Sequence, residues 1–388
     1  MAERPSYNVK NWMRIWLLLL IVVLIIVVIY LSTPRKMSIP RDRYLNTNST
    51  LAPETGKLNP SDLGYPESRG LKASKDRVYA KIRKFLDLPP TAKIILTSGS
   101  TEGIATMVNW AMRYNRDGVV VGTRHDHSSI KDNVEARGMT YMELPHTLKG
   151  LPGNVSAIFW THADAKTGEV IHMPSVHNIQ HLYSDYDSLT ERPLTTSYPP
   201  LIFADVTQSI GKIPVSMTEM GVNGLCFSLH KIGGPQGLGV LVIDEPEWAP
   251  FVPLIAGSQN EGLRGGTQDV QSFVEYSDIY HLTEFSPESR RKRWESAYKK
   301  LKDAKLTVQK PQGEHLYNTL LVDIPESCPL GAIDHLASKG IYVGTTSACL
   351  NEKKDKSISK IRISFIDPAE LDEESLDEII STLTYSKS

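Results

Sequence analysis

Short apolar runs alternate with longer stretches of helical character between residues 90 and 245. Several of these runs are continuously apolar, which is typical of strands that are covered on both faces. Their alternation with helices favours a mostly parallel sheet wrapped by helices, an α/β fold. The expected strands are Ile94–Thr97, Val119–Val121, Met139–Leu144, Ala157–Trp160, Leu201–Ala204, Leu225–Ser228 and Val240–Ile243, and a helix is expected at Thr101–Tyr114.

A smaller α+β unit is expected after this region. Its first element is a long polar helix over Pro287–Ala304, whose basic cluster RRKR…KKLK we interpret as a solvated helix face. Three apolar segments and an acidic helix follow, at Asn318–Ile324, Gly340–Gly344, Ile361–Phe365 and Leu371–Leu383. We therefore divide the body into a large α/β domain, residues 44–285, and a small C-terminal domain, residues 286–388.

The N-terminal part carries the uncharged run IWLLLLIVVLIIVVIYL, residues 15–31. At about 1.5 Å per residue, a helix of this length nearly spans a hydrocarbon core of about 30 Å. A signal peptide or a buried core helix fits less well, because no small-residue cleavage site follows and the run has no polar face. We expect a tail (1–14), one transmembrane helix (15–31) and a linker (32–43). Four basic residues soon after the run, against three before it, slightly favour a single-pass membrane protein with a cytoplasmic body.

Overall charge and cysteine content exclude some classes of function. The net charge is −1, so the whole chain has no basic excess that would indicate binding to nucleic acid. The three cysteines, Cys226, Cys328 and Cys349, cannot form a disulfide framework, and their spacing fits no zinc motif, so we expect no metal site. At least one thiol stays free, which favours a reducing compartment.

Lys231 lies in the segment FSLHKIGGPQGLGV, directly after an apolar strand and before a glycine-rich turn. Burial there would lower the lysine pKa and make the amine a candidate for a Schiff base. A lysine that points to water from a β-turn is the alternative. Asp205 similarly ends the apolar strand LIFAD, at the edge where open α/β sheets bind ligands. A carboxylate there needs a partner such as a protonated ring nitrogen, or else caps the following turn.

The segment TSGSTEG, residues 97–103, leads directly into the expected helix. Hydroxyl groups and free amides at a helix N-terminus form an anion site that suits a phosphate monoester. Serine and threonine at this position are also ordinary N-capping residues, so this motif is weak when taken alone.

Five segments together resemble one family. TSGSTEG, ADVTQSIGKIPV, FSLHKIGGPQGLGVLVI, GLRGGTQDV and TTSAC occur in the order and spacing of the NifS/IscS cysteine desulfurases. These are fold-type I, class V enzymes that use pyridoxal 5′-phosphate (PLP), and the resemblance extends from Tyr44 to the C-terminal helix. It implies a homodimer that converts L-cysteine to L-alanine and passes sulfur to an acceptor protein. The N-terminal run is not typical of this family.

The resemblance also implies a role for individual residues. Lys231 would bind PLP covalently, and Asp205 would keep the pyridine nitrogen protonated. Cys349 would be the nucleophile that receives sulfur as a persulfide, and Arg362 would bind the substrate carboxylate. The other implied cofactor contacts are Gln208 on the phenolic oxygen, Ser100, Thr101, Ser228 and His230 on the phosphate, Thr267 on the partner protomer's phosphate, and His127 stacked on the ring and assisting proton transfer. Cys226 and Cys328 are interpreted as structural.

Two departures from the family pattern affect these expectations. The family's asparagine that contacts the phenolic oxygen falls at Ala165 in HADAKTG. The segment after Cys349, LNEKKDK, lacks the usual small residues and is shorter before Arg362. Two alternatives therefore remain beside the desulfurase: another class V aminotransferase or lyase, and a catalytically inactive membrane-tethered NifS-like protein.

Overall fold

The computed structural model describes residues 66–144, 150–172, 179, 199–277, 287–328, 331–345, 359–365 and 368–385. The expected transmembrane helix at 15–31 and the nucleophile Cys349 lie outside these residues. Within the described ranges, no helix is both long enough and apolar enough to cross a membrane. By internal contacts the chain divides into Met1–Asp42 and Arg43–Ser388, and every element below belongs to the second unit.

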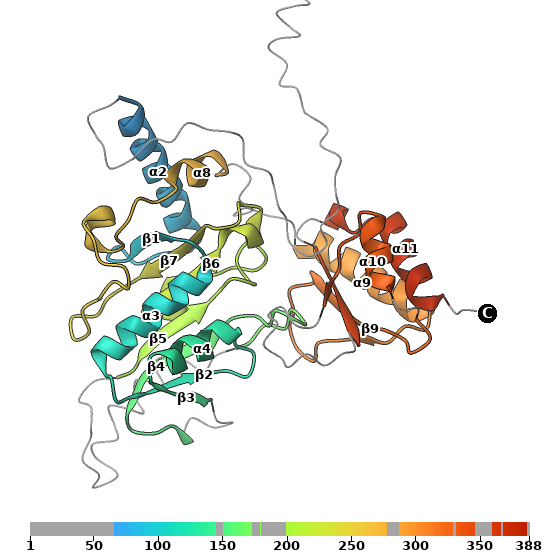
Figure 1. Cartoon of the computed structure of the whole chain (residues 1–388), viewed down its shortest axis with the longest axis horizontal. Coiled ribbons are helices and arrows are strands. Elements are labelled where there is room, and N and C mark those ends of the chain that lie inside the picture. The colour runs from blue at the N-terminus through green and yellow to red at the C-terminus, as the bar shows by residue number, and fades with distance from the viewer. Residues whose placement is uncertain are drawn as a thin grey trace, which may run out of the picture. The chain divides into compact units, whose positions relative to one another are not determined.

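A seven-stranded sheet forms the centre of the larger part (Figure 1). Its spatial order is β1-β7-β6-β5-β4-β2-β3, and the strands from β6 to β3 are parallel. All seven strands expected from the sequence are confirmed within two residues, and the mostly parallel sheet is confirmed too. The strands are β1 (Lys93–Thr97), β2 (Val119–Gly122), β3 (Thr140–Glu143), β4 (Val155–Thr161), β5 (Leu201–Asp205), β6 (Gly224–Ser228) and β7 (Gly239–Ile243).

Strand β7 runs antiparallel to both of its neighbours, β6 and β1. The connection from Ser228 to Gly239 holds only a 3-10 turn, η2 (Leu229–Ile232), and is too short for a crossover helix. Because β7 reverses direction, β1 runs in the same direction as β6. The carboxyl ends of β1, β6, β5, β4 and β2 therefore share one edge of the sheet.

Side chains alternate along each strand between two apolar layers. In β5, Leu201 and Phe203 pack into the cluster that contains α3 and α4, whereas Ile202 and Ala204 pack into the cluster that contains α2. This period-two pattern explains why the strands read as continuously apolar. The helices of this part are α2 (Pro66–Phe85), α3 (Ser100–Tyr114), α4 (Ser128–Ala136), α7 (Met217–Met220) and α8 (Val270–Glu275), with the 3-10 turn η3 (Gln259–Gly262).

A second, antiparallel sheet follows in the chain, with the order β10-β11-β9-β8. It has its own apolar cluster, to which α9, α10 and α11 contribute. The expected strand at Gly340–Gly344 is mostly wrong, because β10 begins only at Gly344. The elements are α9 (Pro287–Asp303), β8 (Val308–Gln309), β9 (Thr319–Asp323), α10 (Ala332–Ser338), β10 (Gly344–Thr345), β11 (Lys360–Ser364), η4 (Pro368–Glu370) and α11 (Glu373–Thr384).

The basic cluster on α9 is only partly a solvated face, so the prediction was wrong at two positions. Arg290 is 1% exposed and shares the buried stripe of the helix with Trp294, Ala297 and Leu301. Helical spacing places it on that stripe regardless of its charge. Its guanidinium donates to main-chain carbonyls of the turn after β5. Arg293 pairs with Glu373 and also donates to a carbonyl.

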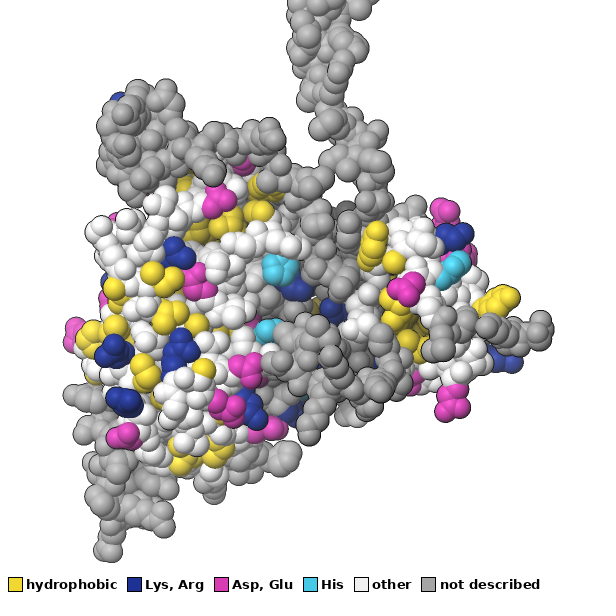
Figure 2. All heavy atoms as spheres, in the orientation of Figure 1, with side chains coloured by type: hydrophobic (Ala, Val, Ile, Leu, Met, Phe, Trp, Pro, Cys, Tyr) yellow, Lys and Arg dark blue, Asp and Glu magenta, His cyan; other side chains and the backbone are white. Residues whose placement is uncertain are grey.

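Charges elsewhere are mixed. On the face shown in Figure 2, acidic and basic side chains of the described residues are interspersed, in keeping with the net charge of −1. Such a surface offers no broad field of one sign for a polyanion.

Candidate functional site

The N-terminus of α3 meets the end of β6 at the shared carboxyl edge. The amide of Ser100 donates to Oγ of Ser228 at 2.8 Å, and the Ser228 hydroxyl donates to Oγ of Ser100 at 2.9 Å. The N-cap residue, Gly99, has no side chain to cap the helix. A Cβ at Gly239 would lie 2.5 Å from Cα of Gly99, so glycine is required where β7 passes this helix end. Two hydroxyls therefore converge at a helix N-terminus whose N-cap residue supplies no side-chain cap, as in anion sites.

Glu102 is the one acidic residue in this first turn, and it is neutralised. Arg264 donates to both carboxylate oxygens, at 2.8 and 3.2 Å. Burial raises the pKa of Glu102, but hydrogen bonds from Arg264 and Ser98 outweigh burial and hold the pKa below its usual value. The pair keeps a negative charge from opposing an anion at the start of α3. It also fixes the GLRGGT loop, in which Thr267 is exposed, beside this helix.

Asp205 lies within electrostatic reach of both Lys231 and His127. Asp205 is 7% exposed at the end of β5, and the amide of Thr207 donates to its Oδ1 at 2.9 Å. Burial raises the pKa of Asp205, while the charges of His127 and Lys231 lower it. Burial, with the nearby Lys231 charge, also lowers the pKa of His230 to about 4. A buried carboxylate that is ionised is stabilised by a cationic partner.

His127 begins α4 as its N-cap residue. Its Nδ1 accepts the amide of Ser129 at 3.2 Å and lies 2.7 Å from the Ser129 hydroxyl. Because Nδ1 is an acceptor, neutral His127 carries its proton on Nε2. The helix cap therefore fixes both the position of the ring and the nitrogen that exchanges a proton.

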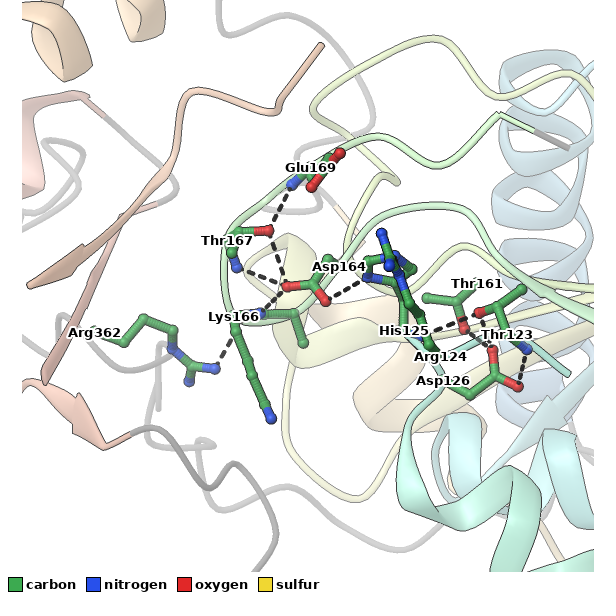
Figure 3. Close-up of polar contacts among 11 residues, drawn as sticks. Thr123, Arg124, His125, Asp126, Thr161, Asp164, Lys166, Thr167, Glu169 and Arg362 are labelled. Atoms are coloured by element: carbon green, nitrogen blue, oxygen red, sulfur yellow. Dashed lines mark hydrogen bonds and ion pairs between the residues drawn. The ribbon is translucent and has the colours of Figure 1, made fainter. Parts of the chain in front are cut away.

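Arg362 on β11 approaches the loop after β4. It is 8% exposed, and its Nη1 donates to the carbonyl of Ala165 at 3.0 Å (Figure 3). Asp164 is hydrogen-bonded to His125, with 2.9 Å between Oδ2 and Nδ1. The loop that carries Ala165 thus contacts Arg362 through its main chain.

One comparison decides the family. The family model "Aminotransferase class-V" matches residues 68–372, most of the chain.

The chain belongs to the class-V aminotransferase family.

Individual relatives also resemble this chain in sequence, and a solved structure resembles it in fold. The chain is 24% identical over 272 residues to the cysteine desulfurase IscS of Pasteurella multocida, covering 68% of this chain and 67% of that protein. It is 26% identical over 262 residues to a cysteine desulfurase of Enterobacter agglomerans, covering 61% and 60%. The chain spans about two thirds or less of the length of these relatives. A solved NifS-like protein matches with a TM-score of 0.69 at 22% identity, covering 84% of this chain and 90% of that chain. At that identity, the structure supports the fold alone.

Members of the class-V family use PLP, and the described residues fit it. The uncapped start of α3 with Ser100 and Ser228 suits the phosphate, and buried Asp205 suits a protonated ring nitrogen. Lys231 follows in η2, close enough to act on Asp205. Thr101 lies in the first turn of α3 and His230 lies in η2, whereas Gln208 lies in the turn after β5 and Thr267 in the loop before α8. Thr101 and Thr267 are exposed.

The three cysteines differ in what the structure shows of them. Cys349, the expected nucleophile, lies outside the described residues. Cys226 is buried in β6, and burial raises its pKa well above the usual value, which fits a structural thiol. Cys328 is half-buried, and burial raises its thiol pKa as well.

Lys212 is a site residue that sequence reasoning missed. It is 5% exposed, and its Nζ donates to the carbonyl of Gln208 at 2.8 Å. Burial and the charges of Lys231 and Arg290 lower its pKa to about 7. Its place in the motif QSIGKIP was visible, but a lysine flanked by turn residues gives no signal of burial. Lys212 and Arg290 together brace the turn that carries Gln208.

Proposed function

We propose that this class-V aminotransferase is a PLP-dependent cysteine desulfurase. It converts L-cysteine to L-alanine as the C–S bond breaks and an S–S bond forms at Cys349, which leaves an enzyme persulfide. The persulfide sulfur then passes to an acceptor protein. The observation that carries the proposal is the buried Asp205, which lies within electrostatic reach of Lys231 and His127 beside the uncapped start of α3.

Each residue has a distinct part in this proposal. When bound, PLP withdraws electrons from the substrate's α-carbon. The amine of Lys231 takes the α-proton, and Nε2 of His127 holds or delivers a proton beside it. Arg362 binds the substrate carboxylate. The thiolate of Cys349 attacks the substrate sulfur, which requires a thiol that is both ionised and accessible.

The test is alanine production from L-cysteine by the full chain loaded with PLP. Wild type and Cys328→Ser, the matched control, should form alanine, whereas Cys349→Ser should form none and keep the absorption of the lysine-bound cofactor. Lys231→Ala should lose that absorption. Undiminished alanine from Cys349→Ser would remove the assigned nucleophile. A keto acid in place of alanine would indicate an aminotransferase, and bound PLP without any turnover would indicate an inactive member.

We also propose that residues 15–31 anchor the protein in a membrane, with the body on the cytoplasmic side. The support is the length and the uncharged character of the run. Leu20→Arg with Leu24→Arg should release the full chain from membranes, since each arginine at a helix centre costs about 3 kcal/mol. Unchanged membrane association of this variant would contradict the anchor.

The proposed assembly is a homodimer in which Thr267 reaches the partner's phosphate. The support is the exposed Thr267 at the end of the GLRGGT loop, which the Arg264–Glu102 pair holds near the start of α3. Sedimentation of the PLP-loaded chain should give a dimer, and Thr267→Ala should weaken PLP binding. A monomer with full PLP affinity would contradict both parts.

A further inference from the structure

Asp164 organises the loop that follows β4. Its Oδ1 accepts the amides of Lys166 and Thr167 at 2.8 and 2.7 Å and the Thr167 hydroxyl at 3.0 Å. Its own amide donates to the carbonyl of Glu169 at 2.8 Å. The side chain thereby fixes the main chain on both sides of Ala165, which has no polar side chain with which to fix itself.

His125 fastens this loop to the loop that follows β2. Its Nδ1 lies 2.9 Å from Oδ2 of Asp164, and Nε of Arg124 donates to its Nε2 at 3.0 Å (Figure 3). Because Nε2 accepts, the proton of neutral His125 is on Nδ1 and is donated to Asp164. Burial raises the pKa of Asp164, but the hydrogen bonds from His125 and the loop outweigh it and lower the pKa to about 2.

Arg362 depends on the same loop. The carbonyl of Ala165 accepts from its Nη1 at 3.0 Å. Burial lowers the pKa of Arg362, and the nearby Asp164 carboxylate partly offsets this effect. The carbonyl therefore sets the direction of the guanidinium, and Asp164 sets the position of the carbonyl. A bidentate contact with a carboxylate requires that direction to be correct.

We propose that Asp164 and His125 are positioning residues for recognition of the substrate carboxylate by Arg362. The proposal rests on the proposed function only in taking Arg362 as the carboxylate contact. In this proposal, the carbonyl of Ala165 supports Arg362, and the pair of His125 and Asp164 holds that carbonyl in place. Ala165 is the position at which the family resemblance leads us to expect an asparagine. Neither residue contacts the substrate itself.

The experiment compares two ligands that differ only in the carboxylate. L-alanine and L-alaninamide are titrated into the PLP-loaded full chain, and the dissociation constant of each is read from the cofactor absorption. The ratio of the alaninamide constant to the alanine constant measures carboxylate recognition. Asp164→Asn and His125→Phe should each lower this ratio about tenfold by weakening alanine binding, with the alaninamide constant unchanged.

Two variants serve as controls. His125→Asn keeps an N–H near the position of Nδ1 and should restore most of the ratio. Glu169→Gln alters a side-chain carboxylate in the same loop that does not contact Asp164, His125 or Arg362, and it should leave the ratio unchanged. An unchanged ratio in Asp164→Asn and His125→Phe overturns the proposal, as does equal weakening of both ligands, which would mean a general loss of structure. A wild type that does not distinguish the ligands also overturns it. A normal ratio without alanine formation from L-cysteine would refute only the desulfurase.

Discussion

Asp126, next to His127, is a carboxylate enclosed by hydrogen-bond donors at the carboxyl edge of the sheet. Its Oδ1 accepts the hydroxyls of Thr123 and Thr161 at 2.6 and 2.7 Å. Its Oδ2 accepts the amide of Thr123 at 2.9 Å and the hydroxyl of Tyr141 at 3.2 Å. Burial nevertheless dominates these four bonds and raises the pKa of Asp126 to about 6.

This raised pKa makes the folded state less stable as the pH rises. An unfolded aspartate loses its proton near pH 4, whereas folded Asp126 keeps its proton until about pH 6. Between these values the folded state binds more protons, so stability falls, by about 3 kcal/mol in total. Asp126→Asn removes the charge and can keep most of the bonds, because threonine and tyrosine hydroxyls rotate to accept from its NH₂ group. We expect the variant to be more stable than wild type by about 1–3 kcal/mol at pH 7.5, and not at pH 4.

Urea unfolding of the full chain at pH 4, 5, 6 and 7.5 measures this difference. The exposed Asp117→Asn is the matched control and should show a difference from wild type that does not change across the series. The reasoning would be refuted if Asp126→Asn differed from wild type by the same amount at pH 4 and pH 7.5, because the folded carboxylate would then titrate as it does in the unfolded chain.

Three further predictions concern other parts of the structure. Ser228→Ala should weaken PLP binding about tenfold in equilibrium dialysis, because it removes the hydroxyl that bonds Ser100 at the start of α3; full affinity would place the phosphate elsewhere. Asp164, whose pKa is about 2, should contribute about 2 kcal/mol to the free energy of unfolding above pH 4, and this contribution is lost as the pH falls toward 2. Asp164→Asn should therefore reduce the decrease in the free energy of unfolding between pH 4 and pH 2; an unchanged decrease would contradict this. Arg290→Met should cost about 2–4 kcal/mol in urea unfolding because it leaves buried carbonyls unpaired, whereas the exposed Lys292→Met should change stability by less than about 0.5 kcal/mol; equal effects would mean that the Arg290 contacts are not stabilising.

The strands could be predicted from sequence because a strand that is buried on both faces is apolar at nearly every position. Leu201–Ala204 reads as apolar at every position since alternate residues meet different helices. The direction of a strand does not affect this pattern of apolar residues. The antiparallel direction of β7 follows from the short connection after Ser228. The positions of the apolar runs alone do not predict this direction.

Part of the site was predictable for a similar reason. Asp205 follows an apolar strand and Lys231 precedes a glycine-rich turn, so each position is determined locally. Arg290, Asp164 and Lys212 were not found, because their burial depends on partners far away in the chain. Charge alone suggested solvent for Arg290, and only the helical stripe it shares with apolar residues contradicts that.

Among the described residues, the buried arginines Arg290 and Arg362 use the same kind of acceptor. Arg362 donates to a carbonyl in the loop after β4, and Arg290 donates to carbonyls in the turn after β5. A carbonyl is present whichever side chain the residue carries, so the loops can change sequence without losing these contacts. Ala165 has no polar side chain, yet its carbonyl still gives Arg362 a partner in that loop. Identity at loop positions is thus a poor measure of whether this carboxyl edge is intact. The side chains that hold the loop backbone, such as Asp164, are the better measure, because their loss moves the carbonyl itself.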